Sequence, residues 1–264
     1  MRVLFIGDVF GPPGMRVVRH YLGGHRADVD LVVANGENAA GGFGITLKHV
    51  EQLWGWGVDV ITLGNHAWDQ TEVVEALERS TRIVRPANYP PGTPGLGFTT
   101  VQTAGGERLT VGQVMGRVFM EPLDDPFAAA DAIVEATPEG QALLIDAHAE
   151  ATSEKKVLGY HLQGRASAVI GTHTHVQTAD EGVFGGTAYI TDVGMSGVQH
   201  SSIGMQFEEV HARFTTRRPH RYRPASGPAT LCGVVLDLHG RRAGSIERFQ
   251  WRERDAAVEG TGGR

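Results

Sequence analysis

The stretch VLFIGD, residues 3–8, decides how this chain folds. Four apolar residues lead directly into a glycine and an acid, which is typical of a short parallel strand that is buried on both faces. Residues 31–34 and 58–63 form two similar runs, rich in β-branched residues, that end at Asn or Gly. Helical periodicity lies between the runs, at residues 15–22 and 47–54. The sequence therefore predicts a βαβαβ unit and a parallel sheet with right-handed crossovers.

The pattern changes after a turn-rich connection at residues 88–95. Residues 97–103 and 109–114 are expected to form antiparallel strands around an Ala-Gly-Gly turn. Further helices are predicted at residues 70–79, 126–136 and 154–163, and further strands at residues 142–147, 168–171, 187–191, 231–238 and 243–251. An α/β fold with two sheets covered by helices fits this order better than one long sheet.

The sequence predicts a single domain over residues 1–252 and a disordered tail over residues 253–264. A hydrophobic content of 41% and a charged content of 20% argue against global disorder. No apolar run approaches the roughly 18 residues of a membrane span, and the start does not have the form of a signal peptide. We therefore expect a cytoplasmic protein with no membrane partner.

Polar clusters follow successive predicted strands, at the point where each strand ends. They are GD at residues 7–8, NGEN at 35–38, GNH at 64–66, DAH at 146–148 and GTHTH at 171–175. Any one cluster is more simply explained as a helix cap, a turn or a structural histidine. Sites of open α/β sheets lie outside the carboxyl ends of the strands, and the joint pattern therefore favours a metal centre there.

The clusters offer oxygen and nitrogen donors and no thiolate. The candidate ligands are the carboxylates of Asp8 and Glu37, the amides of Asn38 and Asn65, and the imidazoles of His148, His173 and His175. This set suits iron, manganese or zinc. Since side chains two residues apart in a strand share a face, His173 and His175 are expected to aim the same way. The single cysteine, Cys232, lies in a predicted strand and is expected to be a buried, inert thiol.

These motifs resemble the signature of the calcineurin-like metallophosphoesterases, and more closely that of their YmdB-like branch. The matching segments are IGDVFG at residues 6–11, NGENAAGG at 35–42, GNHAWD at 64–69, DAHAEATSEK at 146–155 and DVGMSG at 192–197. The resemblance extends over about residues 1–210. It implies the four-layer α/β/β/α sandwich of that superfamily, with two mixed sheets flanked by helices.

The chain departs from the broad superfamily pattern in two places, and the YmdB-like branch shares both changes. Phe10 stands where the general motif has a histidine, and Glu37 followed by Asn38 stands where it has a bridging aspartate. The resemblance implies two divalent or trivalent ions, with iron favoured and manganese or zinc as alternatives. One ion would be held by Asp8, Glu37, Asn38 and His175, and the other by the bridging Glu37 with Asn65, His148 and His173.

The charge of this ligand set favours phosphodiester hydrolysis. Only two of the ligands are anionic, so two divalent ions would leave about two positive charges, and a bridging hydroxide would leave about one. That charge suits a monoanionic phosphodiester, which the hydroxide would attack in line. His66, next to Asn65 but not a ligand, is expected to protonate the leaving oxygen. The resemblance implies cyclic nucleotides, 2′,3′-cyclic ones above all, and Thr174, Ser196 and Asn88 are candidate substrate contacts.

Two alternative functions stay open: a broad-specificity phosphomonoesterase, and a metal- or nucleotide-binding regulator with little turnover. The arginine-rich segment at residues 213–223 bears on the second, since it is either a solvated loop or an arm that contacts phosphate or RNA. The net charge of −6 gives no basic field for general nucleic-acid binding. The resemblance is compatible with a homo-oligomer, although no sequence feature demonstrates one.

Overall fold

A computed structural model describes residues 1–253 and contains two six-stranded sheets. The strands of the first sheet are β1 (Arg2–Ile6), β3 (Leu31–Asn35), β4 (Val60–Thr62), β5 (Ile83–Val84), β13 (Thr230–His239) and β14 (Arg242–Arg252). The strands of the second are β6 (Phe98–Gln102), β7 (Arg108–Met115), β8 (Ala142–His148), β9 (Ala168–Thr172), β10 (Gly182–Phe184) and β11 (Thr187–Ile190). The helices are α1 (Gly11–His25), α2 (Leu47–Gly55), α3 (Val73–Arg79), α4 (Pro126–Ala136), α5 (Thr152–His161), α6 (Phe207–Thr216) and the short 3₁₀ helix η1 (Arg26–Asp28).

Both sheets are mixed, and the strands that carry the polar clusters are parallel neighbours. The first sheet has the order β14-β13-β1-β3-β4-β5, with antiparallel pairing confined to β13 and β14. The second has the order β10-β11-β9-β8-β7-β6, with antiparallel strands at its two edges. A short parallel pair, β2 (Asp8–Val9) with β12 (Met195–Ser196), brings the segment at residues 192–197 beside Asp8.

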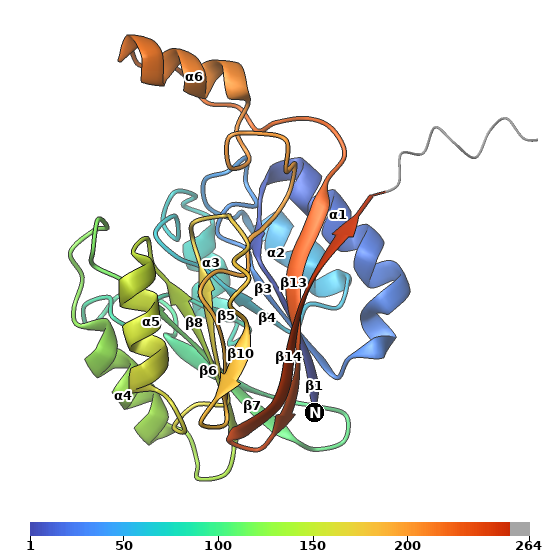
Figure 1. Cartoon of the computed structure of the whole chain (residues 1–264), viewed down its shortest axis with the longest axis vertical. Coiled ribbons are helices and arrows are strands. Elements are labelled where there is room, and N and C mark those ends of the chain that lie inside the picture. Colours follow the sequence, from blue (N-terminus) through green and yellow to red (C-terminus); the bar gives the residue numbers. More distant parts are fainter. Residues whose placement is uncertain (254–264) are drawn as a thin grey trace, which may run out of the picture.

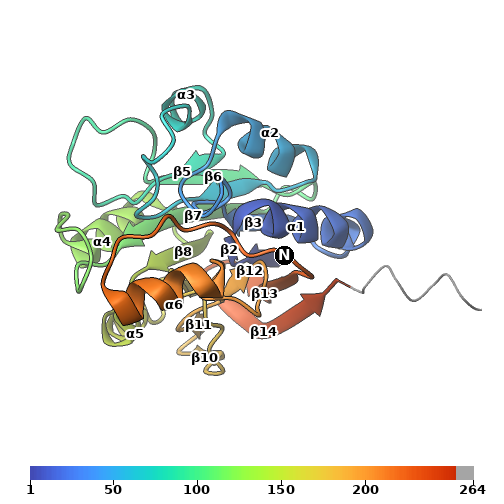
Figure 2. The same ribbon diagram turned by 90° about the horizontal axis from the view of Figure 1, so that it is seen from above.

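The side-chain alternation of the strands builds a four-layer structure. In β1, Val3 and Phe5 face the second sheet, while Leu4 and Ile6 pack against α1, α2 and α3. In β8, Leu144 lies between the sheets, whereas its neighbours pack against α4 and α5. Figure 2 shows the helices on the two outer sides with the sheets between them. The predicted α/β/β/α sandwich is confirmed, and burial on both faces explains why these strands are continuous apolar runs.

Six elements were not predicted from the sequence: β2, β5, β10, β12, η1 and α6. The strands among them have two or three residues, which is too short for a period to show. The prediction that residues 213–223 form a loop or arm is wrong for residues 213–216, because α6 extends to Thr216 and Arg217 ends it in a left-handed conformation. The sequence did contain a signal for this helix. The apolar residues Phe207, Val210 and Phe214 have helical spacing, and the acidic residues Glu208 and Glu209 lie where the first turn is expected.

The structure also bears on the predictions for a membrane span, for the C-terminal tail and for the single cysteine. Among residues 1–253, no helix has the length and apolar character needed to cross a membrane. Glu253, which the prediction placed in the tail, donates its backbone N–H to Ala229 and accepts hydrogen bonds from the guanidinium of Arg16. Residues 254–264 of the predicted tail lie outside the described residues. Cys232 is buried, as predicted, and burial raises the pKa of its thiol to about 12.

The layer between the sheets gives a first testable prediction. Phe5→Ala should lower the free energy of unfolding by about 3–5 kcal/mol, because it empties the volume of a fully buried ring between two sheets that cannot collapse around it. Phe98→Ala, on the edge strand β6 at 37% exposure, should cost about 1 kcal/mol. Urea unfolding followed by circular dichroism compares the two. Equal losses would contradict the four-layer packing.

Candidate metal centre

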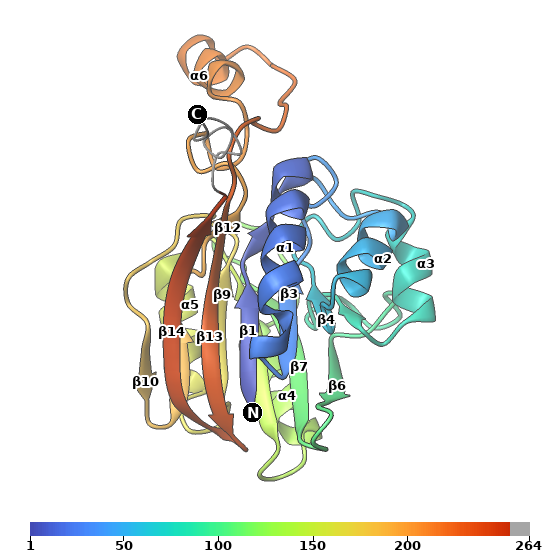
Figure 3. The ribbon, with the colours of Figure 1, turned by 90° about the vertical axis from the view of Figure 1, so that its right-hand side faces the viewer.

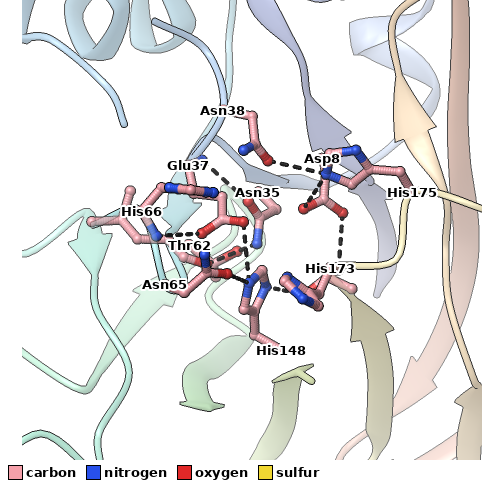
Figure 4. A network of polar contacts seen from close by, with 12 residues as sticks. Asp8, Asn35, Glu37, Asn38, Thr62, Asn65, His66, His148, His173 and His175 are labelled. Atoms are coloured by element: carbon pink, nitrogen blue, oxygen red, sulfur yellow. Dashed lines mark hydrogen bonds and ion pairs between the residues drawn. The ribbon is translucent and has the colours of Figure 1, made fainter. Parts of the chain in front are cut away.

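All of the predicted donors lie together, at the carboxyl ends of strands from both sheets (Figure 4). Asp8 follows β1, Glu37 and Asn38 follow β3, and Asn65 follows β4. His148 is the last residue of β8, and His173 and His175 follow β9. The two sheets thus meet in one polar centre, although the segments that form it are up to 167 residues apart, from Asp8 to His175.

One group of donors surrounds His148. Glu37, His148 and His173 each offer a ligand atom, and these atoms all lie within 4.8 Å of one another. The Nε2 atom of His148 is 2.9 Å from Asn65 Oδ1 and 3.1 Å from Glu37 Oε1. Gly64 makes this approach sterically allowed, because a Cβ there would overlap Glu37 Oε2 and His148 Nε2. The glycine of the GNH motif is therefore required by the centre itself.

The hydrogen bonds around His148 leave this group with more acceptor atoms than donors. Nδ1–H of His148 donates to Thr172 Oγ1 at 2.8 Å, because the Thr172 hydroxyl donates its own proton to Asp146 Oδ1 at 2.6 Å. A neutral His148 then has a bare lone pair on Nε2. That lone pair faces the oxygens of Asn65 and Glu37, and Glu37 Oε1 is buried without a hydrogen bond. A cation would satisfy all three atoms.

A second group, around His175, has the same character. Nδ1–H of His175 donates to the carbonyl oxygen of Ile203 at 3.0 Å, and the Asn38 amide donates to the carbonyl oxygen of Gly42 at 3.0 Å. His175 Nε2 and Asn38 Oδ1 therefore face each other as acceptors, 3.3 Å apart. Asp8 Oδ1 lies 3.7 Å from the same nitrogen and is buried without a hydrogen bond. A cation would satisfy these three atoms as well.

Burial and neighbouring charges shift the pKa values of four side chains of the centre. Burial raises the pKa of Asp8 to about 7, against the opposing effect of His175. Burial also disfavours charge on Glu37 and His148, but their mutual attraction lowers the pKa of Glu37 and raises that of His148 to about 9. Burial, helped by the charge of His148, lowers the pKa of His173 to about 3. The mutual attraction of Glu37 and His148 thus favours their charged forms, whereas burial favours the neutral forms of Asp8 and His173.

The turn that carries His173 and His175 corrects one prediction. The two residues do not share a strand face: β9 ends at Thr172, and both histidines have left-handed backbones, with φ of 97° and 65°. His173 therefore joins the Glu37 group and His175 the Asp8 group. Such conformations persist only where the surroundings enforce them. Here the carboxylate of Asp192 accepts hydrogen bonds from the backbone N–H and the hydroxyl of Thr174, at 3.0 and 2.7 Å.

A buried ion pair stands behind this turn. The Nζ atom of Lys155 donates to Asp192 Oδ2 at 2.7 Å, and both side chains are fully buried. The backbone N–H of Gly194 donates to the other oxygen of Asp192 at 2.8 Å. Lys155 and Asp192 come from two of the motifs in which the sequence resembles the YmdB-like branch. Their structural role is to fix the position of the two histidines.

His66 lies at the open side of the centre. Its backbone N–H donates to Glu37 Oε2 at 3.1 Å, and its Nδ1 lies 2.8 Å from Asp69 Oδ2. The ring of Phe43 meets it edge-on at 5.2 Å between centroids. Asp69 was not singled out as its partner from the sequence, although a spacing of three residues within the GNHAWD motif is the signal that pointed to it.

A cavity of about 380 Å³ opens onto the centre and tests the predicted substrate contacts. It is lined by Glu37, Asn38, His66, Thr174 and the two histidines of the turn, among others. Among the described residues, Asn88 and Ser196 do not line it, which corrects that part of the prediction. The Asn88 amide is buried and donates to the carbonyl oxygens of Met115 and Asp124. Ser196 is buried and bonds the backbone of Cys232.

The buried ion pair gives a second prediction. Lys155→Met should lower the free energy of unfolding by about 3–5 kcal/mol, because it leaves the buried carboxylate of Asp192 without its counter-charge. The neighbouring Lys156 pairs with Asp180 at the surface, so Lys156→Met should cost less than about 1 kcal/mol. Chemical denaturation of the two variants measures the difference. Similar values would show that the pair does not hold the turn.

Comparison with known proteins agrees with the sequence motifs. The family described as YmdB-like protein matches residues 4–249. A 2′,3′-cyclic-nucleotide 2′-phosphodiesterase of Bacillus subtilis is 48% identical over 94% of this chain and 96% of its own length. A hypothetical protein of Thermus thermophilus superposes with a TM-score of 0.92 at 50% identity, covering 96% of this chain and all of its own. A phosphatase of Mycoplasma pneumoniae superposes with a TM-score of 0.90 at 29% identity, covering 97% and 95%. The chain belongs to the YmdB-like protein family.

Proposed function

We propose that this protein is a metal-dependent phosphodiesterase that hydrolyses 2′,3′-cyclic nucleotides. The observation that carries the proposal is the pair of buried groups around His148 and His175, in which oxygen and imidazole nitrogen atoms face one another, Glu37 Oε1 and Asp8 Oδ1 have no hydrogen bond, and residues of both groups line one cavity. The family and the phosphodiesterase of Bacillus subtilis, similar along nearly the whole chain, support a phosphoric ester hydrolase. The name of that relative supports the cyclic nucleotide as substrate.

The ligand sets follow the two groups. Asp8, Glu37, Asn38 and His175 would hold one ion, and Glu37, Asn65, His148 and His173 the other. Glu37 is suited to bridge, because its Oε1 accepts no hydrogen bond and its Oε2 accepts one, from the backbone of His66. Two ions such as iron, manganese or zinc would polarise the phosphoryl oxygens and activate water.

The histidine side chains are oriented for this role by neighbours outside the ligand sets. Thr172 fixes the proton of His148 on Nδ1, and the Ile203 carbonyl does the same for His175. The Nε2 atom of His173 lies 3.1 Å from the carboxylate of Glu150, an arrangement that leaves its Nδ1 as the ligand atom. Hydrogen bonds of this kind select the tautomer and the ring orientation that metal binding needs.

His66 is the proton donor of the proposal. The carboxylate of Asp69 accepts the Nδ1 proton of His66 and orients the ring, so that Nε2 is the atom that carries a proton for the leaving oxygen. The backbone hydrogen bond from His66 to Glu37 holds the ring close to the ligand set. Such a donor contributes about 10²–10⁴-fold to the rate when the leaving group is a poor one.

Metal content tests the ligand assignment. Glu37→Ala should empty both metal positions, because it removes the carboxylate shared by the two groups, whereas Asp69→Asn should retain both ions. Elemental analysis after anaerobic purification and reconstitution gives the stoichiometry of each variant. A Glu37→Ala protein that still binds two ions would overturn the assignment.

Leaving-group dependence tests His66. His66→Asn should lower kcat for 2′,3′-cyclic AMP by about 10²–10⁴-fold with intact metal content, since the leaving alkoxide needs a proton. The kcat for bis-p-nitrophenyl phosphate should fall much less, because its leaving group needs no proton. A uniform loss with both substrates, or no loss with the cyclic nucleotide, would remove His66 from this role.

The two alternative functions are separated by a substrate panel. Metal-reconstituted protein is assayed with 2′,3′-cyclic AMP, 3′,5′-cyclic AMP and p-nitrophenyl phosphate. Preference for the monoester would favour the phosphomonoesterase, and no metal-dependent hydrolysis of any of them would favour the regulator. Neutralising Arg213, Arg217, Arg218, Arg221 and Arg223 shows whether that segment is needed for the chemistry.

A further inference from the structure

The cavity at the metal centre has two unlike walls. One is polar and includes His66 and four of the candidate ligands, which are Glu37, Asn38, His173 and His175. The other is apolar and is lined by Phe10, Phe43, Ile203, Met205, Val210, Phe214 and Tyr222. Metal binding and proton transfer use only the polar wall. The apolar wall is therefore available for the part of the substrate that does not react.

Most of the apolar wall comes from α6 and the segments that flank it. Figures 1 and 3 show α6 standing clear of both sheets, on the side where the strands that carry the centre end. Among the residues of α6, all of which the structure describes, Val210 is the one that is buried. It packs with Phe10, Met195 and Met205, and Tyr222 covers this cluster. The wall thus has a packed base beneath an open rim.

The rim exposes large apolar side chains beside a reactive centre. Phe214 is 69% exposed, Ile203 55% and Phe43 38%, although all three line the cavity. Apolar surface that is left uncovered in a cavity is typical of a ligand-binding wall. Ile203 has a left-handed backbone, with φ of 46°, which is strained for a β-branched residue. Its carbonyl also holds His175, so the wall and the metal centre share one rigid connection.

The chemistry of the wall favours a flat aromatic group. Four of its side chains are aromatic rings, and Met205 adds a polarisable sulfur that packs well against rings. The rings are those of Phe10, Phe43, Phe214 and Tyr222. Glu150 and Ser202 line the same cavity and supply polar atoms for the edge of a heterocycle. A nucleobase has both properties, a face that stacks and an edge that forms hydrogen bonds.

We propose that the apolar wall is a nucleobase subsite in which Phe214 stacks on the base while the phosphate lies at the metal centre. The proposal rests on the proposed function, because it assigns the position of the nucleoside part of that substrate. Phe214 is a specificity-determining residue here and takes no part in the chemistry. Base–aromatic stacking contributes about 1–3 kcal/mol, which corresponds to about 5- to 100-fold in kcat/KM.

Two substrates separate the contribution of the base from that of the cyclic phosphodiester. 2′,3′-cyclic AMP and glycerol 1,2-cyclic phosphate contain the same five-membered cyclic phosphodiester, but the second has no base. Phe214→Ala should lower kcat/KM for cyclic AMP by about 5- to 100-fold, mainly through KM, and leave that for glycerol cyclic phosphate unchanged. Phe214→Trp should retain the preference. Phe214→Leu, which is apolar but cannot stack as a ring, should lose it.

Phe207→Ala is the matched control. Phe207 lies on the same helix at 61% exposure, is stacked on His211 and does not line this cavity, so its removal should change neither substrate. An equal effect of Phe214→Ala on both substrates, or no effect on either, would overturn the subsite. Full activity of Phe214→Leu on cyclic AMP would overturn stacking and favour a purely aliphatic contact.

A binding measurement separates the subsite from the proposed function. Calorimetric titration of the reconstituted protein with adenosine 2′-monophosphate should show binding that Phe214→Ala weakens by about 5- to 100-fold. If the unmodified protein hydrolyses neither cyclic phosphate, the proposed function fails, while weakening of this binding still supports the subsite. If it hydrolyses both equally well and Phe214→Ala leaves binding unchanged, the subsite fails and the phosphodiesterase stands.

Discussion

The buried ion pair between Lys155 and Asp192 is the interaction on which the candidate metal centre depends. Asp192 accepts hydrogen bonds from the backbone N–H and the hydroxyl of Thr174, the residue between the two histidines of the turn. Without this anchor, two residues in left-handed conformations would relax into the extended backbone that they prefer. His173 and His175 would then no longer point into separate donor groups. The ion pair between Lys155 and Asp192 thus determines whether the two histidines lie in separate donor groups.

The same arrangement recurs around each imidazole. Thr172 and Asp146 fix His148, the Ile203 carbonyl fixes His175, and Asp69 fixes His66. Each ring has one nitrogen occupied by the protein, so the other is committed to the centre. If the centre binds ions as proposed, these imidazoles would need little reorganisation on binding.

The fold and the donors could be predicted largely from the sequence, for reasons that particular residues show. Val3 to Ile6 form a run too apolar for a one-sided strand, and a polar cluster follows it, as in every strand that contributes to the centre. The geometry of the His-Thr-His turn could not be predicted, because its backbone is set by Asp192, a partner 18 residues away. Ser196 and Asn88 were misassigned for the same reason. The side chain of a polar residue in a motif can form its hydrogen bonds with backbone groups that are distant in the sequence, and only the tertiary structure reveals this.

Phe10 stands where the broad superfamily has a metal ligand, and in this chain it meets the ring of His175 edge-on and supports Met205 and Val210 beneath α6. Helix α6 is joined to the rest of the molecule through this small cluster, and the two sheets are packed without it. If the apolar wall binds the base as proposed, substitutions on α6 would alter substrate selectivity while the packing that supports the candidate ligands stays the same. Relatives in the family could therefore differ in substrate selectivity through this one helix and keep a common chemistry.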